Sequence, residues 1–289
     1  MENKTEMAFE PLSGTVAELG ESPVWSASEN AVWWVDIAGK RLHRTSAEDG
    51  TTRSWPTPEQ IGFVVLAARG PVVGMESGLF AFDPRGGAFE RIYRLRDPGV
   101  RFNDATVDEA GRLWAGTMDI DNARPAGKLL RIDADLSVTE ILSGFQMPNG
   151  IAVDAARSRL YVSDSDARIQ TVWTVEIDFR TGTIGKRREF KRFNDLAGRP
   201  DGAALDTEGN YWIAGVDGGE IYRFSPEGEH LSTTATPMKF PTKMAFAAGR
   251  MFLTSKAGNG YGGRLVAAQT SIRGSGIAAF GVQDALVPG

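Results

Sequence analysis

The sequence predicts an all-β fold, a six-bladed β-propeller with four-stranded antiparallel blades. Two observations lead to this prediction. Short apolar stretches rich in Val, Ile, Phe, Tyr and Trp alternate with Asp, Gly, Asn and Pro, which is typical of strands joined by tight turns. A unit of about 40 to 50 residues also recurs six times along the 289 residues, and repeats of this period with several strands each are typical of propeller blades.

The six repeats follow one another without a linker or a change in composition, so residues 1–289 are predicted to form one domain. Each repeat has an apolar strand, a turn, a second apolar strand, a Gly-containing loop and a third strand. Residues 1–11 are expected to be a loosely ordered N-terminal extension, and Leu12 to Leu19 to add the outer strand that closes the ring. The repeats cover residues 22–46, 63–84, 103–135, 148–178, 200–228 and 242–268.

Composition excludes several classes of function. The net charge is -5 and no run of five or more Lys and Arg occurs, so a nucleic-acid partner is not expected. The absence of cysteine excludes disulfide scaffolds, thiolate metal sites and cysteine nucleophiles. The N-terminus lacks the apolar run of a signal peptide, and no segment approaches the ~20 apolar residues of a membrane span. The sequence therefore predicts a cytoplasmic protein that does not associate with membranes.

Polar residues stand at equivalent positions in the repeats. The first strand of each propeller blade lines the central channel, so residues at the start of these strands form a ring at one mouth. Three of them, Glu21, Asn149 and Asp201, occur in the matching contexts Glu-Ser-Pro, Pro-Asn-Gly and Pro-Asp-Gly. The whole ring consists of Glu21, Gly62, Asn103, Asp104, Asn149, Asp201, Thr242 and Lys243.

Two carboxylates and a carboxamide in one channel favour a bound cation. Close like charges repel, and a buried amide without a partner is costly. Oxygen ligands favour a hard divalent ion such as Ca²⁺, Mg²⁺ or Mn²⁺, although Zn²⁺ also accepts carboxylate. Three protein ligands leave positions open for water or substrate, as in a catalytic metal site. Asp-Gly and Asn-Gly pairs are also ordinary turn residues, but three polar residues at equivalent repeat positions favour a metal site.

Four ordered motifs carry a family resemblance. The likeness covers nearly all of the domain, from about Leu19 to Val266. The motifs are GESPVW with WWVDI, RFNDATVD with GRLWAGTM, MPNGIAVD with RLYVSDS, and GRPDGAALD with GNYWIAG. They resemble the senescence-marker-protein/gluconolactonase/luciferin-regenerating-enzyme family, which includes the regucalcins. This resemblance implies a six-bladed propeller with one divalent metal ion in the channel, for which Ca²⁺ is the first expectation and Zn²⁺, Mn²⁺ and Mg²⁺ are alternatives.

The resemblance also implies roles for individual residues. It places the metal on Glu21, Asn149 and Asp201 and the substrate hydroxyls against Arg101 and Asn103. Family members use a further acidic residue shortly after the GTM motif. Here Asp121 or Asp119 stands in that position, and Asp121 is our assignment for substrate binding.

These residues together suggest hydrolysis of a sugar lactone of the aldonolactone type. The metal would activate water, Asp201 would accept the proton, and Arg101 and Asn103 would orient the ring. Asp104 is expected to orient Asn103 or to lie behind it. The alternatives are hydrolysis of another ester or a phosphotriester, and a non-enzymatic regulatory propeller that binds metal. A monomer or a weak homodimer is expected.

Aromatic residues and one further acid are expected to be structural. Trp34, Trp114 and Trp212 are predicted in the core on second strands, whereas Trp25, close to Glu21 in sequence, is expected to wall the site. Asp164 is predicted to be a buried acid bound by backbone amides.

Overall fold

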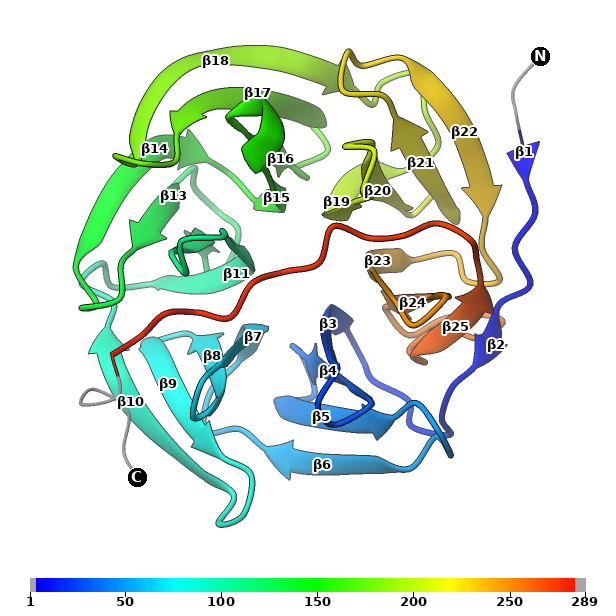
Figure 1. Cartoon of the computed structure of the whole chain (residues 1–289), viewed down its shortest axis with the longest axis horizontal. Coiled ribbons are helices and arrows are strands. Elements are labelled where there is room, and N and C mark those ends of the chain that lie inside the picture. Colours follow the sequence, from blue (N-terminus) through cyan, green and yellow to red (C-terminus); the bar gives the residue numbers. More distant parts are fainter. Residues whose placement is uncertain (1–3, 284–289) are drawn as a thin grey trace.

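The computed structural model describes residues 4–283, which form six sheets arranged in a ring around a central channel (Figure 1). This arrangement confirms the predicted six-bladed propeller. Consecutive strands pair side by side through short connections, so the first strand of each blade lies nearest the channel and the fourth lies outermost. The first four blades are β3 (Gly20–Ser26), β4 (Ala31–Asp36), β5 (Arg41–Ser46) and β6 (Thr52–Pro56); β7 (Ile61–Ala67), β8 (Gly70–Met75), β9 (Gly78–Asp83) and β10 (Ala88–Arg94); β11 (Val100–Val107), β12 (Leu113–Asp119), β13 (Gly127–Ile132) and β14 (Val138–Phe145); and β15 (Pro148–Asp154), β16 (Arg159–Asp164), β17 (Thr171–Asp178) and β18 (Thr183–Arg192).

The N-terminal segment completes the last two blades. Strand β2 (Glu10–Pro11) pairs antiparallel with β25 and gives blade 6 its outer strand, while β1 (Lys4–Thr5) pairs in parallel with β22 of blade 5. Residues 1–3 of the predicted extension lie outside the described residues. Blade 5 also contains β19 (Arg199–Leu205), β20 (Tyr211–Val216), β21 (Glu220–Phe224) and β22 (His230–Ala235), and blade 6 contains β23 (Pro241–Ala247), β24 (Arg250–Ser255) and β25 (Val266–Gln269).

The ring is therefore closed by an N-terminal strand, but this strand precedes the predicted residues 12–19. That segment instead passes from blade 6 to blade 1, where Ala17 packs with Trp34 and Phe252. Leu19 forms an isolated bridge with Lys256. Residues 12–19 thus join the first blade to the last.

The core forms a ring of its own, because each blade buries both faces against its neighbours. The described residues contain six apolar clusters, one for each interface between adjacent blades. Trp34, Trp114 and Trp212 lie on the second strands β4, β12 and β20 and are at most 1% exposed, as predicted. This continuous packing holds the innermost strands rigidly around the channel.

The turns after two innermost strands share one design. Asp108 accepts hydrogen bonds from the Ala110 and Arg112 amides and, through Oδ2, from the indole of Trp114 at 2.9 Å. Asp206 likewise accepts hydrogen bonds from turn amides and from the indole of Trp212 at 2.9 Å. A single carboxylate therefore fixes each turn and anchors the tryptophan of the following strand.

The chain ends in a C-terminal strap, residues 270–283, which crosses the channel from blade 6 to the opposite side of the ring (Figure 1). Backbone hydrogen bonds tie the strap to Leu205 on one side, through the Ser275 amide, and to Leu66 on the other, through the Phe280 amide. The Phe280 side chain enters the apolar cluster between blades 2 and 3. The strap therefore lies over one mouth of the channel and joins distant blades.

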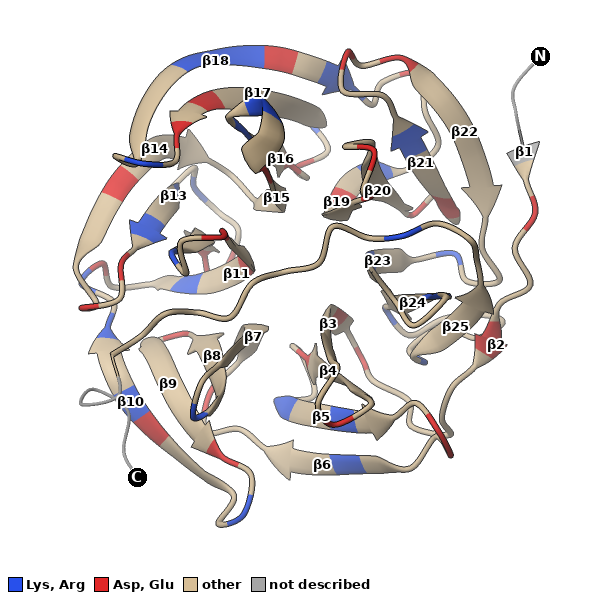
Figure 2. Ribbon diagram, viewed as in Figure 1, with Lys and Arg blue, Asp and Glu red and all other residues tan. Residues whose placement is uncertain are grey.

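Charged residues are unevenly distributed over the ring. Figure 2 shows Lys and Arg mainly on outer strands, most densely on β18. Basic residues in the channel are therefore exceptions that call for a local explanation. Among residues 4–283, no helix is long and apolar enough to span a membrane.

Candidate active site

A β-bulge occurs at the same place in the innermost strand of every blade. In each case the pairing register with the second strand shifts a few residues after the strand begins. A bulge leaves residues unpaired and changes the direction of their side chains. The shifts fall between Glu21 and Val24, Ile61 and Phe63, Phe102 and Ala105, Asn149 and Ala152, Pro200 and Ala203, and Pro241 and Met244.

The predicted ring residues lie in these bulges or directly beside them, so they do not form hairpin turns as their Asp-Gly and Asn-Gly sequences alone would suggest. Glu21, Asn149 and Asp201 lie inside β3, β15 and β19 and are buried. Gly150 has a φ of 58°, in the left-handed region that favours glycine, and a Cβ there would lie 2.5 Å from the Tyr211 hydroxyl. Both the backbone conformation and the lack of space for a Cβ therefore favour glycine at position 150.

Hydrogen bonds connect four of the predicted site residues across three blades. Arg101 Nη1 donates to Asn103 Oδ1 at 2.9 Å. Asn103 Nδ2 donates to Asn149 Oδ1 at 3.0 Å. Asn149 Nδ2 in turn donates to Asp201 Oδ1 at 2.7 Å. The structure thus brings the two carboxamides, the arginine and one carboxylate into a single chain of contacts.

Glu21 and Asp201 influence each other electrostatically. Burial, together with the negative charge of Asp104, raises the pKa of Glu21 from 4.5 to about 7. Burial and the charge of Glu21 raise the pKa of Asp201 well above its usual range. Among the described residues, only the Ser22 amide donates a hydrogen bond to the Glu21 carboxylate, at 2.7 Å. The two predicted carboxylate ligands therefore belong to one site, in which neither carboxylate has a basic side chain as a hydrogen-bond partner among the described residues.

The charges around Glu21 can be counted. The acids Glu21, Asp104 and Asp201 lie within electrostatic range of the bases Lys243 and Arg101, which gives these five groups one net negative charge when all are ionised. Arg199 and Asp217, which also act on Asp201, form an ion pair with each other and leave this balance unchanged. A buried excess charge is costly unless a cation or a proton compensates it. Residues 4–283 contain no cluster of three or more Asp, Glu or His side chains of the kind that holds a metal ion.

A cation at this site would therefore rely on the two carboxylates of Glu21 and Asp201 and on the carboxamide of Asn149. The Asn149 oxygen accepts one hydrogen bond from Asn103, which leaves its second lone pair. These three oxygen donors suit a hard divalent cation, and the excess negative charge favours one.

Arg101 retains hydrogen-bonding capacity in a buried position. The side chain is 8% exposed, and Nε has no partner among the described residues. Burial lowers the pKa of Arg101 to about 10, which still leaves it protonated at neutral pH. Since Nη1 already contacts Asn103 and the Phe102 carbonyl, the remaining donors are the ones available to a ligand.

The two acids after the GTM motif differ in their surroundings. Asp119 is buried, forms a 2.7 Å ion pair with Arg124 and accepts a hydrogen bond from the Ala123 amide. Asp121 is exposed in the same loop and has no side-chain hydrogen bond among residues 4–283. Asp119 thus fixes the conformation of the loop, while the carboxylate of Asp121 remains available to a ligand.

Asp164 has the predicted structural role. Its carboxylate accepts hydrogen bonds from the backbone amides of Gln146, Met147 and Asp166 at 2.7 to 3.1 Å. These contacts fix the segment that leads into β15 and therefore the position of Asn149.

The contact between Lys243 and Asp104 was not predicted. Lys243 is 2% exposed, and its ammonium group contacts the Asp104 carboxylate. Asp104 does not hydrogen-bond Asn103, contrary to one of our expectations; it accepts hydrogen bonds from the Ala105 and Ile151 amides. The only signal in the sequence was that Lys243 occupies the ring position of the sixth repeat.

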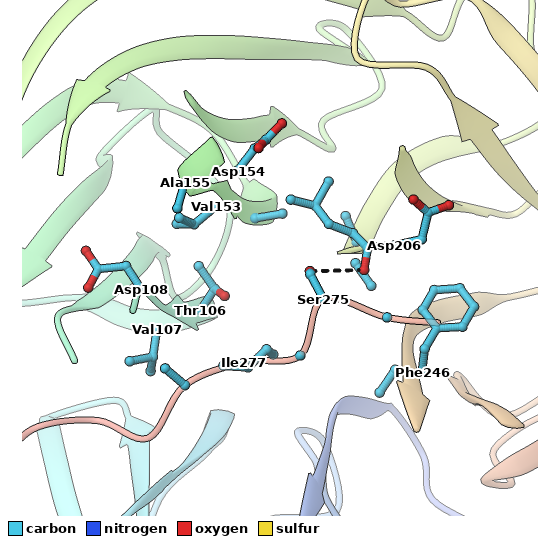
Figure 3. A pocket seen from close by; sticks show the side chains of 18 of the residues that line it. Thr106, Val107, Asp108, Val153, Asp154, Ala155, Asp206, Phe246, Ser275 and Ile277 are labelled. Atoms are coloured by element: carbon cyan, nitrogen blue, oxygen red, sulfur yellow. Dashed lines mark hydrogen bonds between the residues drawn. The ribbon is translucent and has the colours of Figure 1, made fainter. Parts of the chain in front are cut away.

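A cavity of about 550 Å³ lies at the other end of the channel (Figure 3). The last residues of the innermost strands line it, among them Val107 and Asp154, together with Ser275 and Ile277 of the C-terminal strap. None of the predicted metal or substrate residues lines this cavity. The candidate site and the cavity therefore occupy opposite ends of the same strands.

Trp25 belongs to the cavity rather than to the candidate site, so the expectation that it walls the site was wrong. It lines the cavity and stacks on Phe252 with 5.6 Å between ring centroids. Trp25 comes four positions after Glu21, and the bulge of β3 lies between them. Proximity in sequence did not mean proximity in space.

The fold and the site together define a six-bladed propeller with an acid-rich polar site at one end of its channel. Residues 19–257 match the SMP-30/Gluconolactonase/LRE-like region, and the chain belongs to this family. The match confirms the resemblance carried by the four motifs.

Two relatives are lactonases. The chain is 38% identical to a 6-deoxy-6-sulfogluconolactonase from Pseudomonas putida over 231 residues, 79% of each chain. It is 33% identical to a pentonolactonase from Haloferax volcanii over 258 residues, which cover 86% of this chain and 85% of the relative. Both relatives are named for the opening of sugar lactones.

A solved structure confirms the architecture. A calcium-binding protein, regucalcin from Agrobacterium tumefaciens, superimposes with a TM-score of 0.90 over 97% of this chain and 99% of its own. Its sequence identity is 24%, so this likeness concerns the fold.

Proposed function

We propose that this protein is a lactonase that hydrolyses sugar lactones with the help of one divalent cation. The observation that carries the proposal is the chain of contacts from Arg101 through Asn103 and Asn149 to Asp201, next to the charge of Glu21. Membership of a family whose relatives include sugar lactonases supports the same substrate class.

Glu21, Asn149 and Asp201 would hold the cation, for which Ca²⁺ is our first assignment. When bound, such a cation supplies a Lewis acid for the ester carbonyl and lowers the pKa of a water molecule. It would also neutralise the excess negative charge at Glu21 and Asp201.

Asp201 is the proposed proton acceptor. Its Oδ1 accepts the hydrogen bond from Asn149, while Oδ2 has no hydrogen bond among the described residues. As water attacks the carbonyl carbon, Asp201 takes the proton and the ring C–O bond breaks. The proton then passes to the ring oxygen, and the product is the open hydroxy acid.

Arg101 and Asn103 would orient the substrate through its hydroxyl groups. Both are buried and fixed by hydrogen bonds, so little conformational freedom is lost when a ligand binds. Asp121 is the proposed additional contact, because its exposed carboxylate lies in the loop whose shape Asp119 fixes.

The test is a turnover screen of the purified protein against aldonolactones, with acid release followed by a pH indicator. We expect a chelator to abolish turnover and Ca²⁺, Mn²⁺ or Zn²⁺ to restore it to different extents. A simple aryl ester and a phosphotriester serve as comparison substrates. Full activity in a verified metal-free sample would contradict the proposed mechanism, and turnover of the comparison substrates alone would contradict the substrate class.

A further inference from the structure

Lys243 crosses the channel between blades that lie opposite each other in the ring. It belongs to β23 of blade 6, whereas its partners belong to β11 of blade 3. The ammonium group contacts Asp104 Oδ1 and donates to the Ala105 carbonyl at 3.1 Å. A buried lysine is rarely found without such a partner, because its charge is costly away from water.

The blade that contains Asp201 leaves space for the lysine. A Cβ on Gly202 would lie 2.4 Å from Lys243 Cβ and 2.5 Å from its Cγ. Gly202 is not at a left-handed φ, so the backbone conformation does not require glycine here. The glycine that follows Asp201 instead accommodates the alkyl chain of Lys243.

Both oxygens of Asp104 are occupied. Oδ1 accepts from the Ala105 amide at 2.8 Å as well as from Lys243, and Oδ2 accepts from the Ile151 amide at 2.9 Å. Asp104 directly follows Asn103, and Ile151 lies two residues after Asn149. The ion pair is therefore attached to the same bulges that carry the proposed binding residues.

Asp104 places a further negative charge near the proposed cation site. Its negative charge raises the pKa of both Glu21 and Asp201, so it lies within electrostatic range of both proposed ligands. The charge of Lys243 acts on Glu21 in the opposite direction. The balance of charge at the site thus depends on Lys243.

We propose that Lys243 limits the negative charge that Asp104 brings to the cation site and so weakens the binding of a divalent cation there. This inference rests on the proposed function, because it concerns the same cation. Charges interact more strongly in a buried site than in water, so the Asp104 carboxylate attracts a nearby cation more strongly when its buried counter-ion is removed. Lys243 therefore lowers the cation affinity of the site.

The experiment measures Ca²⁺ binding by calorimetry in metal-free protein, without any lactone. Lys243→Met keeps the alkyl chain and removes the charge, so Asp104 loses its counter-ion. We expect Ca²⁺ to bind at least about tenfold more tightly, equivalent to about 1.4 kcal/mol.

Asp104→Asn provides the opposite change. It leaves the ammonium of Lys243 without a negative partner, and we expect Ca²⁺ to bind at least about tenfold more weakly. The double variant Asp104→Asn with Lys243→Met removes both charges and should return the affinity to within about threefold of the wild type. A purely structural ion pair would weaken binding in both single variants, and that result would overturn the inference.

The outcomes separate this inference from the proposed function. If the wild type binds no divalent cation, the proposed metal site is wrong and the inference falls with it. If the wild type binds Ca²⁺ but Lys243→Met binds it equally or less tightly, only the inference is overturned. If Lys243→Met does not fold, Asp104→Asn decides, and unchanged or tighter binding in that variant overturns the inference.

Discussion

The Nδ2 group of Asn149 on blade 4 donates a hydrogen bond to the Asp201 carboxylate on blade 5 over 2.7 Å. The contact joins equivalent bulges of neighbouring blades. It orients the Asp201 carboxylate and leaves its second oxygen without a hydrogen bond, so a change at Asp201 gives the most direct test of the site.

Asp201→Asn keeps the size of the side chain and removes its charge and its capacity to accept a proton. We expect turnover of a sugar lactone to fall by about a thousandfold or more, about 4 kcal/mol of barrier, even at saturating metal. Metal affinity should also weaken. Asp178→Asn, at the exposed end of β17 and paired with Arg180, is the matched control and should leave turnover unchanged. Activity fully restored by excess metal would leave Asp201 a ligand and require another base.

Arg101→Ala should affect substrates according to their hydroxyl groups. We expect kcat/KM for a polyhydroxylated lactone to fall far more than for a lactone without hydroxyls, because the lost guanidinium donors have no partner on the latter. Arg168→Ala, which removes an exposed arginine paired with Asp166, should change neither value. Equal losses on both lactones would assign Arg101 a structural role.

His43 should make stability depend on pH. Burial lowers its pKa from 6.5 to about 4, and its ring stacks on Trp34. Because the unfolded chain takes up a proton at higher pH than the folded chain, this residue's contribution is complete above about pH 6.5 and is lost as the pH falls toward 4, by about 3 kcal/mol. In urea unfolding, His43→Gln should lose less stability than the wild type between pH 7 and pH 4. If the free energy of unfolding falls equally with pH in the two proteins, this prediction is wrong.

Phe280→Ala should destabilise the fold without altering the candidate site. Phe280 is 1% exposed in the cluster between blades 2 and 3, and its truncation should cost about 3 kcal/mol or more. Ile277→Ala, in the same strap but 38% exposed, is the control and should cost less than about 1 kcal/mol. Calcium affinity should match the wild type in both variants, and a change in Phe280→Ala would show that the two channel mouths are coupled.

The sequence was sufficient to predict the features that repeat. The six blades and the equivalence of Glu21, Asn149 and Asp201 followed from aligned repeats, because each repeat is one local unit of consecutive strands. The buried tryptophans of the second strands were predictable for the same reason.

Features that occur once were not predictable in this way. The ion pair of Lys243 with Asp104 depends on which blades face each other, and nothing near Lys243 in sequence indicates its partner. The C-terminal strap has no counterpart in the repeats. Trp25 was misplaced because its neighbour Glu21 is at the opposite end of one extended strand.

The strap and the N-terminal strand have a consequence for the order of folding during synthesis. Hairpins of the first four blades need only residues that have already emerged, so they can form one after another. The pairing of Glu10 with Ala267 must wait until nearly the whole chain has been made, and Phe280 reaches the gap between blades 2 and 3 later still. A nascent chain that lacks residues 267–283 therefore leaves the edge of blade 6 unpaired and the apolar surface beneath Phe280 exposed. Synthesis of these residues covers two surfaces that favour aggregation.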